Sequence, residues 1–143
     1  MTVRVQQDVF DPWRELAAHE TAQVERLAGQ AGAAVVFVGR MRDFSHGTPV
    51  TAMRLEHYSG MTEAYLEKIS IEACTRWELL DTLILHRFGS LQPDDPIVLV
   101  AAWSAHRDAA FAATRYLIDE LKTRAPFWKQ EQTPAGNRWV QPG

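Results

Sequence analysis

Two apolar runs, at residues 33–41 and 97–103, constrain the fold of this chain more than any other feature. The first reads Ala-Ala-Val-Val-Phe-Val-Gly-Arg-Met, and the second reads Ile-Val-Leu-Val-Ala-Ala-Trp. Short apolar runs that are rich in β-branched residues and bounded by turn residues are typical of buried strands. The sequence therefore predicts a sheet with at least two buried strands, the first of which ends in basic residues.

The rest of the chain supplies helices and further strands around these runs. We predict helices over residues 12 to about 28, possibly in two pieces, over 61–77, and from Ser104 to about residue 124, before Pro126. Further strands are expected at 3–5, 51–58 and 80–88, with loops at 43–49 and 89–93. The order β-α-β-β-α-β-β-α with a short tail predicts an α/β or α+β fold with flanking helices, formed by one domain over residues 1–143.

Composition narrows the class of protein. A net charge of −3 argues against general binding of nucleic acids. The single cysteine, Cys74, cannot form an internal disulfide, and His46, His57 and His86 lack the spacing of metal ligands. The N-terminus has no signal-peptide pattern, and no apolar run approaches the ~20 residues of a membrane span. We therefore expect a cytoplasmic protein without a bound metal or cofactor.

The segment 121–131 carries the most informative basic residues. Two of the three lysines in the chain, Lys122 and Lys129, flank Pro126, Phe127 and Trp128. Fixed cations beside apolar walls suit an anionic ligand that contains a ring. Lys122 also has a structural explanation, because a lysine in the last turn of a helix complements the helix dipole. Either the lysines hold charge, or a desolvated lysine beside a second cation acts as nucleophile or base.

Two other basic groups are candidates for a site. Arg40 and Arg42 end a predicted buried strand, and His106 and Arg107 begin a predicted helix, where backbone N–H groups favour anions. The alternative explanation for both groups is that they are solvated side chains at the ends of a strand and a helix. His106 and Lys122 lie sixteen residues apart on one predicted helix, about 24 Å at 1.5 Å per residue. One small ligand that uses both groups would therefore need a second copy of the chain.

The chain resembles the large, catalytic subunit of molybdopterin synthase from about residue 32 to residue 139. The resemblance rests on five motifs in order: Val-Gly-Arg-Met-Arg (38–42), Leu-Glu-His-Tyr-Ser-Gly-Met (55–61), His-Arg-Phe-Gly-Ser-Leu-Gln-Pro-Asp-Asp (86–95), Ser-Ala-His-Arg (104–107) and Leu-Lys-Thr-Arg-Ala-Pro-Phe-Trp-Lys-Gln-Glu (121–131). The last motif is the most specific. The N-terminal part matches loosely, and the end Gln141-Pro142-Gly143 is not the Gly-Gly of a sulfur carrier.

The resemblance implies an α/β hammerhead fold and a homodimer within a heterotetramer. A small ubiquitin-like sulfur-carrier subunit would insert its C-terminal thiocarboxylate into a pocket, and two sulfurs would pass to cyclic pyranopterin monophosphate. By similarity, Lys122 and Lys129 are the catalytic residues. The substrate-binding positions implied are Phe37, Arg40, Met41, Arg42, His106, Arg107, Lys122, Lys129, Gln130 and Glu131.

Two rival functions remain open from the sequence. A binding module could use the basic pocket only to dock an anionic protein tail, and it would bind the small subunit without turnover. A different enzyme on this scaffold could use the lysines on another phosphorylated heterocycle, without a sulfur carrier.

Overall fold

The core of the protein is a four-stranded sheet that is covered on both faces. The computed structural model describes residues 1–45 and 47–140. The strands of this first sheet lie in the order β1 (Thr2–Gln6), β6 (Asp81–Arg87), β8 (Pro96–Ser104) and β2 (Ala33–Arg40). β1 runs parallel to β6, whereas the other neighbours are antiparallel, so the sheet is mixed. The two apolar runs of the sequence form its β2 and β8.

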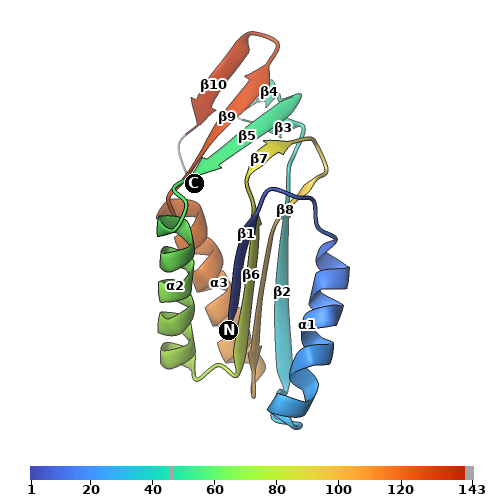
Figure 1. Ribbon diagram of the computed structural model, residues 1–143, viewed down its shortest axis with the longest axis vertical. Helices are drawn as coiled ribbons and strands as arrows, with labels where there is room; N and C mark the ends of the chain where they lie inside the picture. The colour runs from blue at the N-terminus through green and yellow to red at the C-terminus, as the bar shows by residue number, and fades with distance from the viewer. Residues whose placement is uncertain (46, 141–143) are drawn as a thin grey trace.

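A second, antiparallel sheet lies across one end of the first (Figure 1). Its strands are β10 (Gly136–Val140), β9 (Phe127–Thr133), β5 (Ala52–His57) and β7 (Gly89–Leu91). A two-stranded pair, β3 (Phe44–Ser45) and β4 (Thr48–Pro49), lies beside it.

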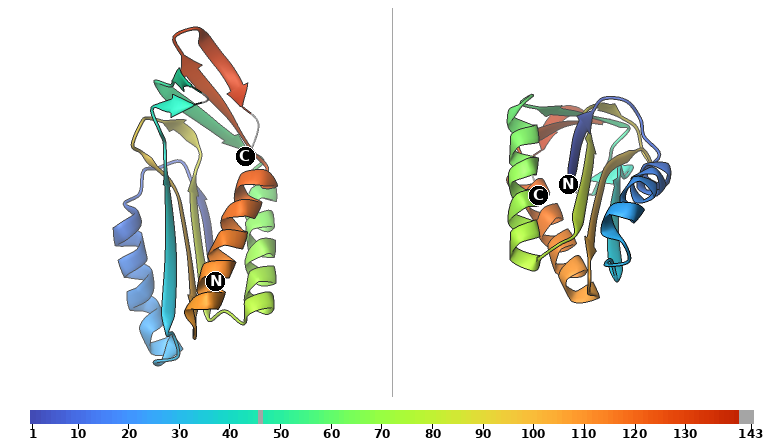
Figure 2. Two further views of the ribbon diagram at one scale, coloured as in Figure 1. Left: turned by 180° about the vertical axis from the view of Figure 1, so that it is seen from behind. Right: turned by 60° about the horizontal axis from the view of Figure 1, so that its bottom comes forward.

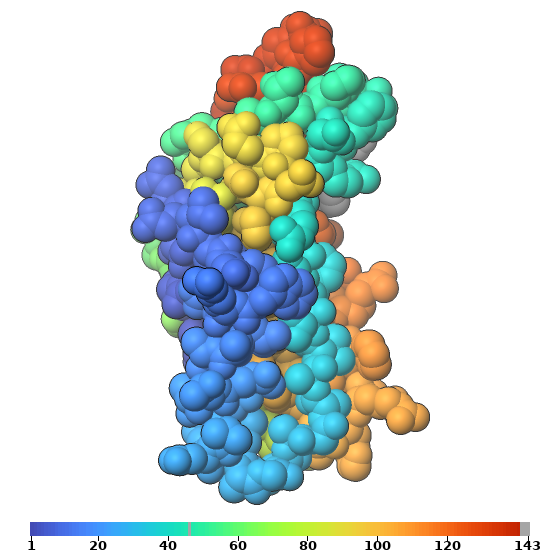
Figure 3. Space-filling view, turned by 90° about the vertical axis from the view of Figure 1, so that its right-hand side faces the viewer, coloured from blue at the N-terminus to red at the C-terminus, as the bar shows by residue number. Residues whose placement is uncertain are grey.

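Three helices cover the first sheet. α1 (Pro12–Leu27) lies on one face, and α2 (Met61–Trp77) and α3 (Arg107–Thr123) lie together on the other (Figure 2). The space-filling view shows α1 beside the edge strand β2, with the second sheet beyond them (Figure 3). None of the helices in the described ranges is long and apolar enough to cross a membrane.

Period-two alternation in the central strands builds a core on each face of the sheet. On β6, Leu83 and Leu85 pack with Trp103 in the cluster on the α1 side. Ile84 and Val100 belong to the cluster under α2 and α3, which also contains residues of the second sheet. Because both of its faces are buried, β8 appears in the sequence as a continuous apolar run rather than an alternating one.

The predicted class, a mixed sheet with flanking helices, is confirmed, and so is the α/β hammerhead arrangement. Two local predictions are wrong. The expected loops at 43–49 and 89–93 contain β3, β4 and β7, although His46 lies outside the described residues. The short tail is a strand pair, β9 and β10. The predicted first helix is confirmed as one piece, capped by Asp11, whose carboxylate accepts the backbone N–H of Trp13.

The start of α3 also differs from the prediction. Ser104 is still paired with Ala33 in the sheet, so it cannot cap a helix. His106 is the N-cap instead, with extended φ −130° and ψ 149°, and Arg107 is the first helical residue. The apolar strand β8 therefore extends farther than the hydroxyl side chain of Ser104 suggested.

Asp81 at the start of β6 is a buried acidic hub. Its carboxylate oxygens accept bonds at 2.7 Å from the N-terminal ammonium, His19 and Gln23, and Arg26 donates at 3.0 Å. Burial alone would raise the pKa of Asp81, but these hydrogen bonds and the N-terminal charge outweigh it and hold the pKa well below its usual range. The hub ties α1 and the chain start to the sheet.

The variant Asp81→Asn is expected to lower the free energy of unfolding by about 3 kcal/mol at pH 7, because it removes the buried negative charge that four donors share. A depressed carboxyl pKa stabilises the fold above the unfolded value of about 4, and this stability is lost as pH falls through the acid range. Urea unfolding at pH 7 and in acid should show a flatter acid dependence in the variant. Asp119→Asn, at an exposed ion pair on α3, is the matched control; equal losses in both would contradict the hub.

Candidate active site

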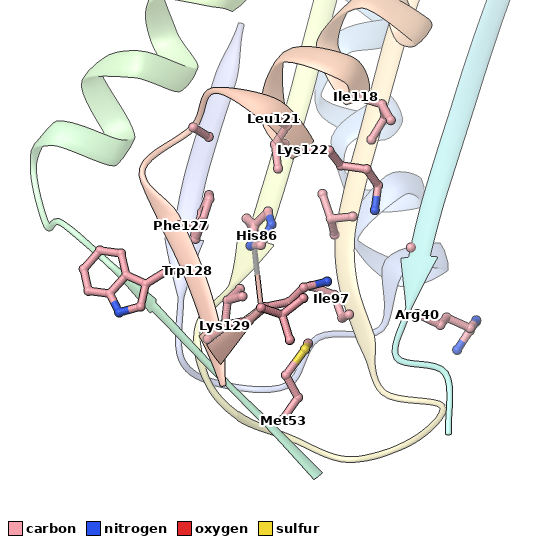
Figure 4. Close-up of a pocket in the computed structure, with 15 residues that line it drawn as sticks. Arg40, Met53, His86, Ile97, Ile118, Leu121, Lys122, Phe127, Trp128 and Lys129 are labelled. Carbon is pink, nitrogen blue, oxygen red and sulfur yellow. The ribbon is translucent and has the colours of Figure 1, made fainter. Parts of the chain in front are cut away.

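A pocket opens where the two sheets meet the C-terminal end of α3 (Figure 4). It encloses about 720 Å³ of space, a figure that includes space open to solvent. Its lining comes from both sheets and from α3, so the site exists only when the whole fold is assembled. The lining residues are Gly39, Arg40, Met53, Leu55, His86, Ile97, Val98, Ile118, Leu121, Lys122, Ala125, Phe127, Trp128, Lys129 and Val140.

The structure brings the two predicted lysines together. Lys122 comes from the last turn of α3 and Lys129 from β9, and both line the pocket with their ammonium groups extending into it (Figure 4). Partial burial, followed by the charges of Lys129 and Arg42, lowers the pKa of Lys122. Lys122 still reaches solvent, so a ligand can contact it. The pair therefore forms a cationic centre with a more readily deprotonated amine than a surface lysine.

The apolar wall is also present. Phe127 is buried and stacks on His86 with ring centroids 3.9 Å apart. Trp128 lines the pocket and contacts Tyr58, with ring centroids 4.7 Å apart. Phe127 and Trp128 thus lie beside the lysines as an apolar wall, as the segment 121–131 predicted. The aromatic wall and the two lysines lie in one short segment. Pro126 separates Lys122, at the end of α3, from Phe127, Trp128 and Lys129 on β9.

The three predicted positions at and just after the end of β2, residues 40–42, lie in different surroundings. A register shift between Gly39 and Arg40 ends β2, and Arg40 lines the pocket while its guanidinium donates to the carbonyl oxygen of Asp94 at 3.3 Å. Met41 is 4% exposed and belongs to the hydrophobic core. Arg42 is exposed and close enough to lower the pKa of Lys122. Arg40 and Arg42 are thus both near the lysines, although Met41 packs inward.

Three further predicted substrate-binding positions are not among the residues that line the pocket. They are Phe37, Gln130 and Glu131. Phe37 is partly buried against the core on β2. Gln130 is half-buried on β9, opposite Trp139 of β10.

The carboxylate of Glu131 is already engaged within the chain. It is 4% exposed and accepts a bond from Nε of Arg138 at 3.1 Å. Arg138 also donates to the carbonyl oxygen of Ser45 at 3.0 Å. In this arrangement Glu131 fixes the β9–β10 pair that carries Lys129.

His106 and Arg107 lie apart from the lysines. They line a second, open pocket with Gly32, Ala105 and Asp108 at the N-terminal end of α3. The helix separates the two pockets by its whole length, as expected from the sequence spacing. Its first backbone N–H groups and the arginine together favour an anion.

Gly32 allows the close approach that shapes this second pocket. A Cβ on Gly32 would lie 2.1 Å from the carbonyl oxygen of Ala105, far inside contact distance. Gly32→Ala should therefore lower the free energy of unfolding by about 1–3 kcal/mol, since the backbone must shift. Thermal unfolding compared with the exposed neighbour variant Ala31→Ser, expected within about 0.5 kcal/mol of the wild type, tests this. A Gly32→Ala variant as stable as Ala31→Ser would contradict this, because it would show that the backbone at Gly32 and Ala105 moves apart at no cost in stability.

The sequence reasoning missed His86 and the β5 residues Met53 and Leu55. Its sequence spacing excluded only a metal-ligand role for His86, which is both buried and pocket-lining. The motif that begins at His86 was a signal, but only the fold shows that the end of β6 reaches the pocket floor.

Geometry and charge together define a binding protein or enzyme for an anionic, ring-bearing ligand: two lysines beside an aromatic wall, and a separate anion site. A profile of the family described as MoaE protein matches residues 10–124. The molybdopterin synthase catalytic subunit of Pseudomonas aeruginosa is 54% identical over 141 residues, covering 99% of this chain and 91% of the relative.

Solved structures agree with the sequence comparison. The molybdopterin biosynthesis MoaE protein from Burkholderia ambifaria superposes with a TM-score of 0.79 at 50% identity, covering 97% of this chain and 88% of that one. Molybdopterin synthase from Staphylococcus aureus gives a TM-score of 0.79 at 31% identity, covering 95% and 94%. The chain belongs to the MoaE protein family.

Proposed function

We propose that this chain is the catalytic subunit of a molybdopterin synthase. It transfers two sulfurs from the C-terminal thiocarboxylate of a small sulfur-carrier subunit to cyclic pyranopterin monophosphate, which becomes molybdopterin. The observation that carries the proposal is the paired Lys122 and Lys129 against the Phe127–Trp128 wall, in a chain about half identical to relatives named as this catalytic subunit. A phosphorylated pterin needs both the cations and the flat apolar surface.

The lysines act on the acyl group of the carrier. Once the thiocarboxylate sulfur is bonded to the pterin, water attacks the carbonyl carbon and negative charge develops on the carbonyl oxygen. The carbon–sulfur bond to the carrier then breaks, so the sulfur stays on the pterin and the carrier becomes a carboxylate. A fixed ammonium beside that oxygen stabilises the charge without reorganisation. The lowered pKa of Lys122 also suits it to exchange a proton in this step. The sulfur comes from the carrier, so Cys74 is not required.

The remaining predicted residues hold the substrate. Arg42, His106 and Arg107 bind the phosphate, and Arg40 supplies a further positive charge at the pocket. Phe37, Met41, Gln130 and Glu131 support this site, the last through the Arg138 ion pair that orders β9.

The active unit is a homodimer with a carrier at each end, a heterotetramer. His106 and Arg107 are a helix length from Lys122 in one chain, so they complete the pocket of a neighbouring copy. We place the complex in the cytoplasm and treat residues 1–143 as one domain, because one hydrophobic cluster joins both sheets among the described residues.

Reconstitution tests the proposal. The protein is mixed with a thiocarboxylated small subunit and cyclic pyranopterin monophosphate, and the oxidised fluorescent pterin is assayed for dithiolene-derived product. Product should require all three components. Complex formation without product would favour the docking module. Turnover of another phosphorylated heterocycle without a carrier would favour the rival enzyme.

A further inference from the structure

His86 is a buried histidine that the proposed chemistry leaves without a role. It lies near the end of β6 and is held on both sides by the sheet, opposite Val5 of β1 and Val98 of β8. Its side chain is 5% exposed, yet it lines the pocket beside Lys122 and Lys129 (Figure 4). Phe127 stacks on the ring and fixes its plane. The ring is therefore rigid and aimed at the site.

Hydrogen bonding defines which nitrogen of His86 carries the proton. Nδ1 lies 2.7 Å from the carbonyl oxygen of Arg87, which can only accept, so Nδ1 donates. In the neutral ring, Nε2 then has a lone pair and no proton. No described residue hydrogen bonds to Nε2. Within the described ranges, Thr82 Oγ1 is the only polar side-chain atom that is both sealed from solvent and without a hydrogen-bond partner. Nε2 of His86 also has no partner, so it is not sealed, and it opens onto the pocket that His86 lines.

The surroundings keep the ring neutral. Burial, with smaller contributions from the charges of Lys122 and His57, lowers the pKa of His86 to about 4 against the opposing bond to the Arg87 carbonyl. The groups near it are Lys122 from α3, Lys129 from β9 and His57 from β5. At neutral pH the pocket therefore combines cationic donors with one imidazole that only accepts through its free nitrogen.

Cationic donor side chains alone cannot satisfy a pterin. Its ring carries N–H groups, and each that is buried without an acceptor costs binding free energy. Lys122, Lys129 and Arg40 have no acceptor atoms. We propose that Nε2 of His86 accepts a hydrogen bond from a ring N–H of the bound pterin and so makes His86 a specificity-determining residue of this pocket. The inference rests on the proposed function, since it takes its ligand from it.

Two variants separate the acceptor from the packing of the ring. His86→Phe keeps the stack on Phe127 and removes the lone pair, and His86→Gln can return an oxygen acceptor near the position of Nε2. Binding of cyclic pyranopterin monophosphate to the intact protein is measured by calorimetry, and turnover is measured with the carrier. The Phe variant should raise Kd and KM about tenfold with kcat within about twofold, and the Gln variant should recover most of the loss. Thr82→Val, a buried change on the same strand, should bind as the wild type does.

Several results would overturn the inference. Unchanged Kd in a folded Phe variant, a loss in kcat alone, or equal losses in the Phe and Gln variants would each do so. The wild type gives a test that needs no variant: the ¹⁵N resonance of Nε2 of His86 should move on saturation with the pterin, and an unmoved resonance refutes the hydrogen bond. A wild-type protein that does not bind the pterin refutes the proposed function instead.

Discussion

Replacing Lys122 with alanine should lower synthase turnover at least about a hundredfold, while the protein still folds and still binds the carrier subunit. The ammonium group lines the pocket at the end of α3, and Lys129 and Arg42 lower its pKa after the effect of burial. The side chain reaches solvent, so its loss leaves no buried cavity. Turnover is measured by product formation, and carrier binding by calorimetry.

The third lysine of the chain provides the control. Lys68 is exposed on α2, outside the residues that line the pocket, and Lys68→Ala should retain wild-type turnover. Lys122→Arg separates two roles for the lysine, because arginine keeps the charge but does not lose its proton in proteins. Full activity in Lys122→Ala would end the catalytic assignment. Full activity in Lys122→Arg would leave Lys122 only as a fixed charge.

Mixed dimers should recover activity from two inactive variants. A heterodimer of Lys122→Ala with Arg107→Ala, purified through two different tags, should reach about half of wild-type turnover. In a shared site, one of its two pockets combines an intact Lys122 with an intact Arg107 from the neighbouring chain. The other pocket lacks both. Each variant as a homodimer should be nearly inactive.

The reciprocal heterodimer is the matched control. When a wild-type chain is paired with the double variant Lys122→Ala/Arg107→Ala, each shared pocket lacks one group, so turnover should stay near zero. A site built within one chain predicts the opposite pattern, with half activity here and none in the first heterodimer. The separation of the two pockets along α3 makes the shared pattern the expected one.

The sequence predicted the elements whose pattern is strong. The run that became β8 is buried on both faces, the run that became β2 is partly buried at the sheet edge, and the α3 stripe ending at Leu121 has helical spacing. β9 was missed because its polar sequence, Phe-Trp-Lys-Gln-Glu-Gln-Thr, carries little strand pattern. It is a strand because β5 and β10 hydrogen bond to it on either side. Such long-range pairing cannot be seen in a local window.

The charged residues of the site were predictable from the sequence, but the lining residues His86, Met53 and Leu55 were not. Lys122 and Lys129 were evident as rare lysines around an aromatic pair, and the helix length predicted that His106 lies elsewhere. The role of His86 needed the structure, because its burial, its tautomer and its stack on Phe127 depend on three different elements. The inward packing of Met41 likewise needed the structure, because its backbone is held by hydrogen bonds to Asp94 and Asp95, far along the chain.

The most direct test of the account is the sulfur balance of the reconstituted reaction. Mass spectrometry of the carrier before and after turnover counts the thiocarboxylates converted to carboxylates, and the same samples give the molecules of dithiolene product. The account predicts two carriers consumed for each product molecule, with none consumed productively when Lys122 is alanine. Carriers that keep their sulfur while product forms, or carriers that lose it without any product, would contradict the assignment of this pocket to sulfur transfer.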